Sequence, residues 1–165
     1  MEPEYEFSRT AANHFFSASV KLTVVEDVYA DRGPLGGIFT GLRVIAAPRA
    51  IVVACDMPLL DPALMRVLLL MSNDRKLVVP MNAGRLEPLC AVYATSCLEA
   101  LHKCLEANDL RLTRFVEANA DYILQPNEWM HFDREGLSFR NLNRQLDLDN
   151  AIEVLLARKE KASGT

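Results

Sequence analysis

A chain of 165 residues, half of them apolar, is long enough for one hydrophobic core and too short for two comfortable domains. Its formal net charge of -4 argues against a surface built to neutralise nucleic-acid phosphates. No apolar run is long enough to cross a bilayer, and the acidic N-terminus lacks the order of a signal peptide. We therefore expect a soluble, cytoplasmic protein that binds neither nucleic acid nor membranes.

The first third of the chain predicts two strands with a helix between them. Residues 21–26, Lys-Leu-Thr-Val-Val-Glu, predict a short strand. Residues 35–46 follow a Gly-Pro pair and predict a helix with Pro34 near its first turn. Residues 50–55 are almost continuously apolar, as expected for a strand buried on both faces.

The rest of the chain continues this alternation. Asp61 and Pro62 predict the N-cap and first position of a helix, and Thr95 predicts the cap of another. Further strands are predicted at 76–79, 89–93 and 122–124, and further amphipathic helices at 110–118 and 148–158, with an irregular stretch between 125 and 145. Such alternation is typical of an α/β sheet with crossover helices. We expect a single domain over residues 1–158 and a polar tail over 159–165.

The cysteines and histidines carry no metal-ligand pattern. None of the four cysteines forms a Cys-x-x-Cys pair, and the three histidines share no ligand spacing. We expect the cysteines to act as small buried apolar residues.

Asp56 is the sharpest candidate for chemistry. It lies just past a predicted buried strand, in Ala-Cys-Asp-Met-Pro, where open α/β sheets bind their ligands. One carboxylate there can hold Mg²⁺ against substrate phosphates, because Mg²⁺ takes few protein oxygens and fills its shell with water and phosphate. The same residue also suits an ordinary turn, and spacing alone does not decide between the two.

Three weaker features surround this one. The pair Glu26-Asp27 precedes the glycines of Gly-Pro-Leu-Gly-Gly at 33–37, where a helix start can approach an anion or simply pack tightly. Residues 84–89, Gly-Arg-Leu-Glu-Pro-Leu, place a cation and a carboxylate at a strand edge, where an ordinary surface ion pair is the alternative. Asn141 and Asn143 lie on one side of an extended segment and can bind hydroxyls, phosphates or a heterocycle edge, or simply form a turn.

Taken together and in order, these segments resemble the motif series of molybdenum-cofactor guanylyltransferases, the MobA-like proteins. The matching segments are 24–27, 33–38, 55–58, 84–89 with Tyr93, Arg111 with Phe115, and 139–143. Each is short, but six in the right order between about residues 22 and 156 are specific.

The resemblance implies a Rossmann-like, three-layer nucleotidyltransferase fold, akin to that of nucleotide-sugar transferases. It implies Mg²⁺-dependent transfer of GMP from GTP to the terminal phosphate of molybdopterin, with release of pyrophosphate. In that role Asp56 holds Mg²⁺ and is the catalytic residue, while Asp27 contacts the nucleoside of GTP. The resemblance also places Gly36 and Gly37 at the GTP site.

The same resemblance assigns the pterin side of the site to a second group of residues. Asn141 and Asn143 are expected to face the pterin, with Arg85, Glu87 and Arg111 near that pocket. The implied partners are GTP and molybdopterin, together with self-association or a molybdoenzyme or other cofactor-biosynthesis protein.

Other functions remain open at this point. Members of the family begin with a strand and a Leu-Ala-Gly-Gly loop that grips the nucleotide phosphates. Residues 1–20 contain no match to it, so we expect a domain that is incomplete at its N-terminus. The alternatives are a non-catalytic module that binds a pterin or protein partner, or a molybdopterin cytidylyltransferase. Cytidylyltransferases of this kind tend to carry glutamine at the position of Met57, which favours guanine here.

Overall fold

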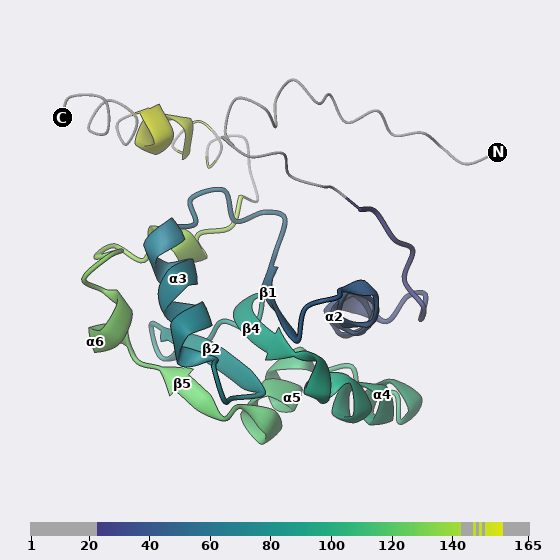
Figure 1. The fold of residues 1–165 in the computed structure, drawn as a ribbon. Coiled ribbons are helices and arrows are strands. Elements are labelled where there is room, and N and C mark those ends of the chain that lie inside the picture. The colour runs from purple at the N-terminus through teal and green to yellow at the C-terminus, as the bar shows by residue number, and fades with distance from the viewer. Residues whose placement is uncertain (1–22, 143–146, 148, 150, 157–165) are drawn as a thin grey trace.

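The computed structural model describes residues 23–142, 147, 149 and 151–156, and Figure 1 shows their arrangement. The helices and strands are, in chain order, α2 (Gly33–Val44), β1 (Arg49–Val53), α3 (Pro62–Met71), β2 (Leu77–Asn82), β3 (Arg85–Leu86), β4 (Cys90–Ala94), α4 (Leu98–Glu106), α5 (Leu112–Asn119), β5 (Tyr122–Leu124) and α6 (Pro126–Trp129). Short 3₁₀ turns lie at Thr95–Cys97 and Leu137–Phe139. No helix in these residues is long and apolar enough to cross a membrane.

The five strands form one mixed sheet in the order β1-β4-β2-β3, with β5 paired to β2. β4 runs antiparallel to both β1 and β2, whereas β5 runs parallel to β2. The predicted α/β class is therefore confirmed, and the carboxyl ends of β1, β2 and β5 meet at one end of the sheet.

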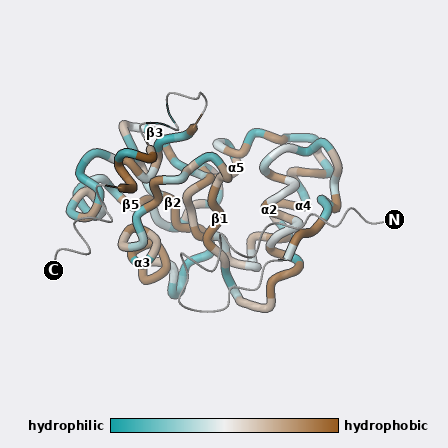
Figure 2. Tube along the Cα trace, turned by 90° about the horizontal axis from the view of Figure 1, so that it is seen from above, coloured by the Kyte–Doolittle hydropathy of each residue, from teal (hydrophilic) through white to brown (hydrophobic). Residues whose placement is uncertain are grey.

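Helices cover both faces of the sheet and give the molecule three layers (Figure 1). Side chains alternate along a strand, so Ala91 and Tyr93 of β4 join the cluster under α2, α4 and α5. Cys90 and Val92 join a second cluster under α3 and α6. Seen from above, the hydrophobic stretches of the strands lie between α3 on one side and α2 and α4 on the other (Figure 2).

One of the two predicted helix caps is confirmed. Asp61 accepts a hydrogen bond from Ala63 N at 2.8 Å, and Pro62 occupies the first turn of α3. The prediction for Thr95 is wrong: its hydroxyl donates to Pro48 O at 3.2 Å, and α4 begins only at Leu98 without a side-chain cap. Thr95 instead ties the end of β4 to the start of β1.

The described part of the predicted strand 21–26 is not a strand. Residues 23–28 have no ladder partner in the described chain, and Val24 is 83% exposed. A strand forms only where a neighbour completes its ladder, and apolar sequence alone does not supply one.

The expectation for residues 50–55 is half right. Residues 50–53 belong to β1, which ends at Val53, but the strand is only partly buried, with Val53 37% exposed. β1 pairs with β4 on one side and lies at the edge of the described sheet. The apolar run therefore marks an edge strand, and one that is not buried on both faces.

Residues 125–142 hold more structure than their sequence predicted. Trp129 of α6 donates from Nε1 to Met81 O at 3.1 Å and stacks edge-on against Phe139. These long-range contacts, which no local period reveals, fix the segment against β2. Residues 151–156 are helical as expected, and Ala151 is buried. Residue 149 is helical too, whereas residues 148, 150, 157 and 158 of that predicted helix, the N-terminal segment 1–22 and the tail 159–165 lie outside the described residues.

The prediction that the cysteines are small buried residues is confirmed for Cys90 and Cys97, but not for Cys55 and Cys104. Cys90 and Cys97 are buried among apolar side chains, whereas Cys55 is exposed because it follows the end of β1. The described residues contain no group of three or more histidine, cysteine or acidic side chains that could hold a metal.

Candidate functional site

Asp56 lies at the carboxyl end of β1, in a turn fixed from both sides. Met57 N donates to Ala54 O at 3.4 Å, and Leu142 N donates to Asp56 O at 2.8 Å. The side chain is half-buried, and its Oδ1 atom is buried with no hydrogen-bond partner in the described structure. A buried carboxylate oxygen without a partner is costly, and a cation or a ligand donor removes that cost. The site therefore fits a metal ion held by one carboxylate.

A buried carboxylate holds the segment that reaches Asp56. Asp133 is 3% exposed and accepts hydrogen bonds from Leu137 N at 2.9 Å and Ser138 N at 2.7 Å. Ser138 Oγ in turn accepts from Asp61 N at 2.9 Å. This network positions the turn that is followed by Asn141, which is exposed and one residue away from the bond to Asp56.

The hairpin of β2 and β3 contributes a second polar group at the same end of the sheet. Asn82 Nδ2 donates to Glu87 Oε1 at 3.3 Å. Burial raises the pKa of Glu87, while the hydrogen bond from Asn82 and the nearby charge of Arg85 oppose that rise. A Cβ built on Gly136 would lie 3.4 Å from Asn82 Oδ1, so the hairpin and the 133–142 segment touch at this point.

Asn82 is a residue that the sequence analysis missed. It lies at the last position of β2, beyond the end of the predicted strand 76–79. A polar residue that ends a buried apolar strand was the available signal, as it was for Asp56.

The start of α2 brings Asp27 and Gly37 together. Val28 N donates to Thr40 Oγ1 at 3.0 Å, which fixes the segment beside the helix. A Cβ built on Gly37 would lie 3.9 Å from Asp27 Oδ1, and both residues are exposed. Gly36 is buried instead: a Cβ there would lie 3.1 Å from Tyr29 O, so this glycine permits close packing of the preceding turn.

Arg111 lies apart from the other candidates. It precedes α5, its side chain is 69% exposed, and its Nε atom pairs with Asp109 Oδ1 at 3.3 Å. Arg114 binds the other oxygen of Asp109 at 3.0 Å. Asn143, the last candidate residue, lies outside the described residues.

A small hollow lies beside Asn141. It has a volume of about 160 Å³ and is lined by Leu59, Arg140, Asn141, Leu142, Asp147, Ala151 and Val154. It is smaller than the pockets that enclose whole cofactors, so it fits one polar group of a ligand rather than a complete substrate.

A three-layer α/β architecture with polar residues at the carboxyl ends of parallel strands is typical of α/β proteins that bind nucleotides. The match to the model of the MobA-like NTP transferase domain covers residues 7–122. The chain belongs to this MobA-like family.

Relatives named as cofactor guanylyltransferases share about a third of the sequence. A probable molybdenum cofactor guanylyltransferase of Pelotomaculum thermopropionicum is 35% identical over 131 residues, which cover 79% of this chain and 63% of the relative. One of Natronomonas pharaonis is 36% identical over 134 residues, or 81% of this chain and 66% of the relative. The chain thus spans less than two thirds of the length of these relatives.

A solved structure supports the fold. The molybdopterin-guanine dinucleotide biosynthesis protein A of Archaeoglobus fulgidus matches with a TM-score of 0.65 and 26% identity, over 76% of this chain and 64% of that protein. The predicted nucleotidyltransferase fold is therefore confirmed.

Proposed function

We propose that this chain carries the metal and nucleotide site of a guanylyltransferase that moves GMP from GTP to molybdopterin and releases pyrophosphate. One observation of the structure carries the proposal: Asp56, at the carboxyl end of β1, has a buried Oδ1 atom with no partner in the described residues. The proposal is supported by the names of two matched relatives, each a probable molybdenum cofactor guanylyltransferase.

The reaction needs charge neutralisation more than proton transfer. An ionised oxygen of the molybdopterin phosphate attacks the α-phosphorus of GTP, a new P–O bond forms, and the bond to pyrophosphate breaks. The nucleophile is already an anion, so no general base is required. Mg²⁺, when bound, supplies the positive charge that lets the two anions approach, and Asp56 is the residue that would hold it.

The start of α2 suits the nucleoside side of GTP. Asp27 can accept hydrogen bonds from a hydroxyl or a base N–H group. Gly37 leaves the helix surface open beside that carboxylate. Gly36 acts indirectly, because it lets the turn at Tyr29 close against the helix.

The hairpin and the 133–142 segment suit the pterin side. Asn141 offers an exposed amide close to Asp56, and Glu87 and Arg85 offer an acceptor and a donor on the neighbouring hairpin. We also assign Asn143 and Arg111 to this side, and Arg111 would have to leave Asp109 to reach a ligand.

Guanine is the preferred base. Met57 is 6% exposed and packs in the apolar cluster under α3. The glutamine that cytidylyltransferases tend to carry there would bury an amide in this cluster, so the two specificities need different packing behind Asp56.

Calorimetric titration of the full chain with GTP, with CTP and with GTP in EDTA tests the proposal. We expect binding of Mg-GTP that exceeds binding of Mg-CTP. In Asp56→Ala it should weaken by at least about tenfold, the size of loss that even an outer partner of a metal ligand can cause. Asp74→Ala is the matched control, because Asp74 is an exposed carboxylate near the opposite end of the sheet.

Each other outcome selects a different function. Stronger binding of CTP would favour the cytidylyltransferase. A folded protein that binds neither nucleotide would contradict the catalytic proposal and favour a module that binds a pterin or protein partner. Equal loss in Asp56→Ala and Asp74→Ala would contradict the metal role of Asp56.

A further inference from the structure

Residues 27–32, here called the Asp27 turn, lead into α2 and are held by contacts with two helices. Of residues 23–31, every one except Tyr29 is exposed, so side-chain burial alone does not fix the course of this segment. The contacts come from a buried hydroxyl of α2, a group of aromatic rings and the end of α4. α2 and α4 lie side by side, so the turn can be held by both (Figure 1).

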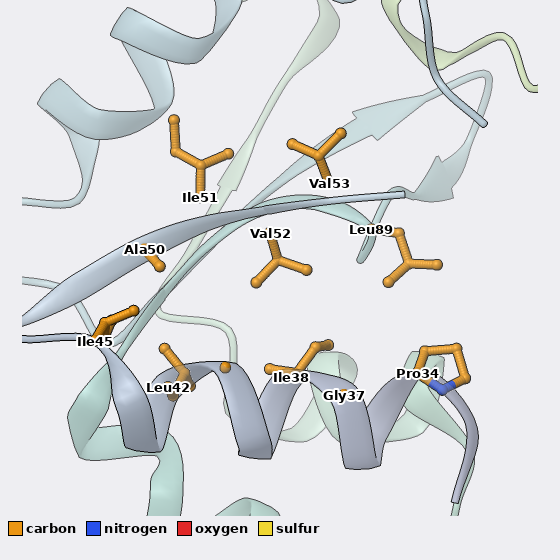
Figure 3. Close-up of a pocket in the computed structure, with 11 residues that line it drawn as sticks. Pro34, Gly37, Ile38, Leu42, Ile45, Ala50, Ile51, Val52, Val53 and Leu89 are labelled. Atoms are coloured by element: carbon orange, nitrogen blue, oxygen red, sulfur yellow. The ribbon is translucent and has the colours of Figure 1, made fainter. Parts of the chain in front are cut away.

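Thr40 supplies the buried hydroxyl. It is 2% exposed, and its Oγ1 atom accepts a hydrogen bond from Val28 N at 3.0 Å. Ile38 and Leu42 of α2 point toward β1 (Figure 3), and at 3.6 residues per turn Thr40 lies on the opposite side of the helix. Val28 directly follows Asp27, so this bond fixes the main chain next to the carboxylate.

Aromatic rings hold the next residue of the turn. The ring of Tyr29 packs edge-on against Phe39 of α2, with the centroids 5.4 Å apart, and its centroid lies 6.1 Å from that of His102 of α4. His102 in turn stacks on Phe39 at 5.8 Å. A Cβ atom on Gly36 would lie 3.1 Å from Tyr29 O, so this glycine lets the main chain of the turn approach α2 closely.

The end of α4 holds the other end of the turn. Asn108 lies just past the helix in the left-handed conformation, with φ at 54°, which asparagine tolerates better than most residues. Its Oδ1 atom accepts a hydrogen bond from the Arg32 guanidinium. Asn108 N donates to Leu105 O at 3.2 Å, which ties this residue to the last turn of α4. The Asp27 turn is thus bonded to α2 near its start and to α4 at its end.

We propose that Thr40 and Asn108 are positioning residues, which hold the Asp27 carboxylate beside Gly37 so that it can accept hydrogen bonds from the nucleoside of GTP. The inference rests on the proposed function, in which Asp27 binds that nucleoside. Asp27 Oδ1 would lie 3.9 Å from a Cβ atom on Gly37, so the carboxylate already lies near the helix surface. In this role neither positioning residue needs to touch the nucleotide. A turn that is held in place does not have to be ordered when the ligand binds, which increases affinity.

Calorimetric titration of the full chain with Mg-GTP tests the role of Thr40. Thr40→Val keeps the shape of the side chain but removes the acceptor, and it should weaken binding by about tenfold, the value of one hydrogen bond to a charged group. Thr40→Ser keeps the acceptor and should bind Mg-GTP as the unaltered chain does. Mg-tripolyphosphate, which offers the phosphates without a nucleoside, should bind equally to all three. Thr95→Val is the matched control, because it removes a hydroxyl bond at the opposite end of the sheet and should leave Mg-GTP binding unchanged.

A double-mutant cycle separates positioning from a general loss of structure. Asp27→Ala should weaken Mg-GTP binding by at least about tenfold, and Thr40→Val should add no further loss in that variant, because no carboxylate remains to be positioned. Asn108→Gly keeps the left-handed conformation without the acceptor and should weaken binding by roughly threefold, whereas Asn108→Asp keeps an acceptor and should not. A further loss in the Asp27→Ala background overturns the proposal. Equal losses in Thr40→Val and Thr40→Ser, or equal weakening of Mg-GTP and Mg-tripolyphosphate, overturn it as well.

Failure of the proposed function would give a different result. An unaltered chain that binds no Mg-GTP contradicts that function, whereas binding that Thr40→Val leaves unchanged contradicts only the positioning role. Amide hydrogen exchange at Val28 provides a measurement without any ligand. We expect faster exchange in Thr40→Val than in the unaltered chain or in Thr40→Ser, because the hydroxyl oxygen protects the N–H group that it binds. Equal exchange in all three proteins overturns the proposal even where no nucleotide binds.

Discussion

β1 and β4 are neighbouring strands of five residues each, both mostly apolar, yet they are buried to very different extents. Every residue of β4 is buried, because β4 has a strand on each side and helices on both faces. Among the described residues, β1 has one neighbouring strand, and a hollow lies between it and α2. The apolar composition of a strand therefore favours burial, but the strands and helices packed against it determine how much of it is buried.

The largest expected effect separates these two strands directly. Val92 in β4 is 1% exposed, and Val52 in β1 is only partly buried. Val92→Ala should lower the free energy of unfolding by about 2–3 kcal/mol, since it removes two buried methyl groups and leaves a cavity. Val52→Ala should cost about 1 kcal/mol. Urea unfolding of both variants measures this difference. Equal losses in the free energy of unfolding would contradict the smaller burial of β1.

The sequence predicted the strands and helices better than it predicted their surroundings. The pattern located α2, α3, β4 and β5 to within a few residues, because propensity, caps and periodicity are local properties. It placed β1 correctly but assigned it the wrong burial, and it read residues 23–26 as a strand, because both depend on distant neighbours.

The candidate site shows the same division. Asp56 could be identified from the sequence because it follows an apolar run and because a carboxylate is a residue type that can bind Mg²⁺. The bond from Asp61 N to Ser138 Oγ and the approach of Asn82 to Gly136 could not be predicted, because each joins segments that only the tertiary fold brings together. Site residues on loops are visible in a sequence, while the residues that position them are not.

A smaller effect tests how firmly the 133–142 segment is built. Asp133→Asn replaces one acceptor oxygen with an NH₂ group that faces a backbone N–H group, so the free energy of unfolding should fall by about 2 kcal/mol. Ser138→Ala, which leaves Asp61 N without its acceptor, should cost about 1 kcal/mol. Chemical denaturation measures both. A loss in Asp133→Asn no larger than in Ser138→Ala would contradict the central role of that carboxylate.

The smallest expected effect concerns pH and Glu87. Burial raises the pKa of Glu87 in the folded chain, so the folded state holds this proton more tightly than the unfolded state. The contribution of Glu87 to stability is therefore most favourable below its ordinary pKa of 4.5 and is lost as pH rises through the raised value. Glu87→Gln keeps an acceptor for Asn82 but cannot ionise. Relative to the unaltered chain, this variant should gain stability between pH 4 and pH 7 in urea titrations, and a difference that does not change with pH would contradict the shift.

The single tryptophan of the chain is also a natural optical probe of the candidate site. Trp129 is buried, and its Nε1 atom donates a hydrogen bond to Met81 O near the end of β2. Its ring packs edge-on against Phe139, which precedes Asn141 by two residues. Its emission wavelength reports whether the indole is shielded from water, so a ligand that shifts the 133–142 segment should change the fluorescence of the unlabelled protein. Binding at this end of the sheet can therefore be followed in real time without a dye or an added mutation.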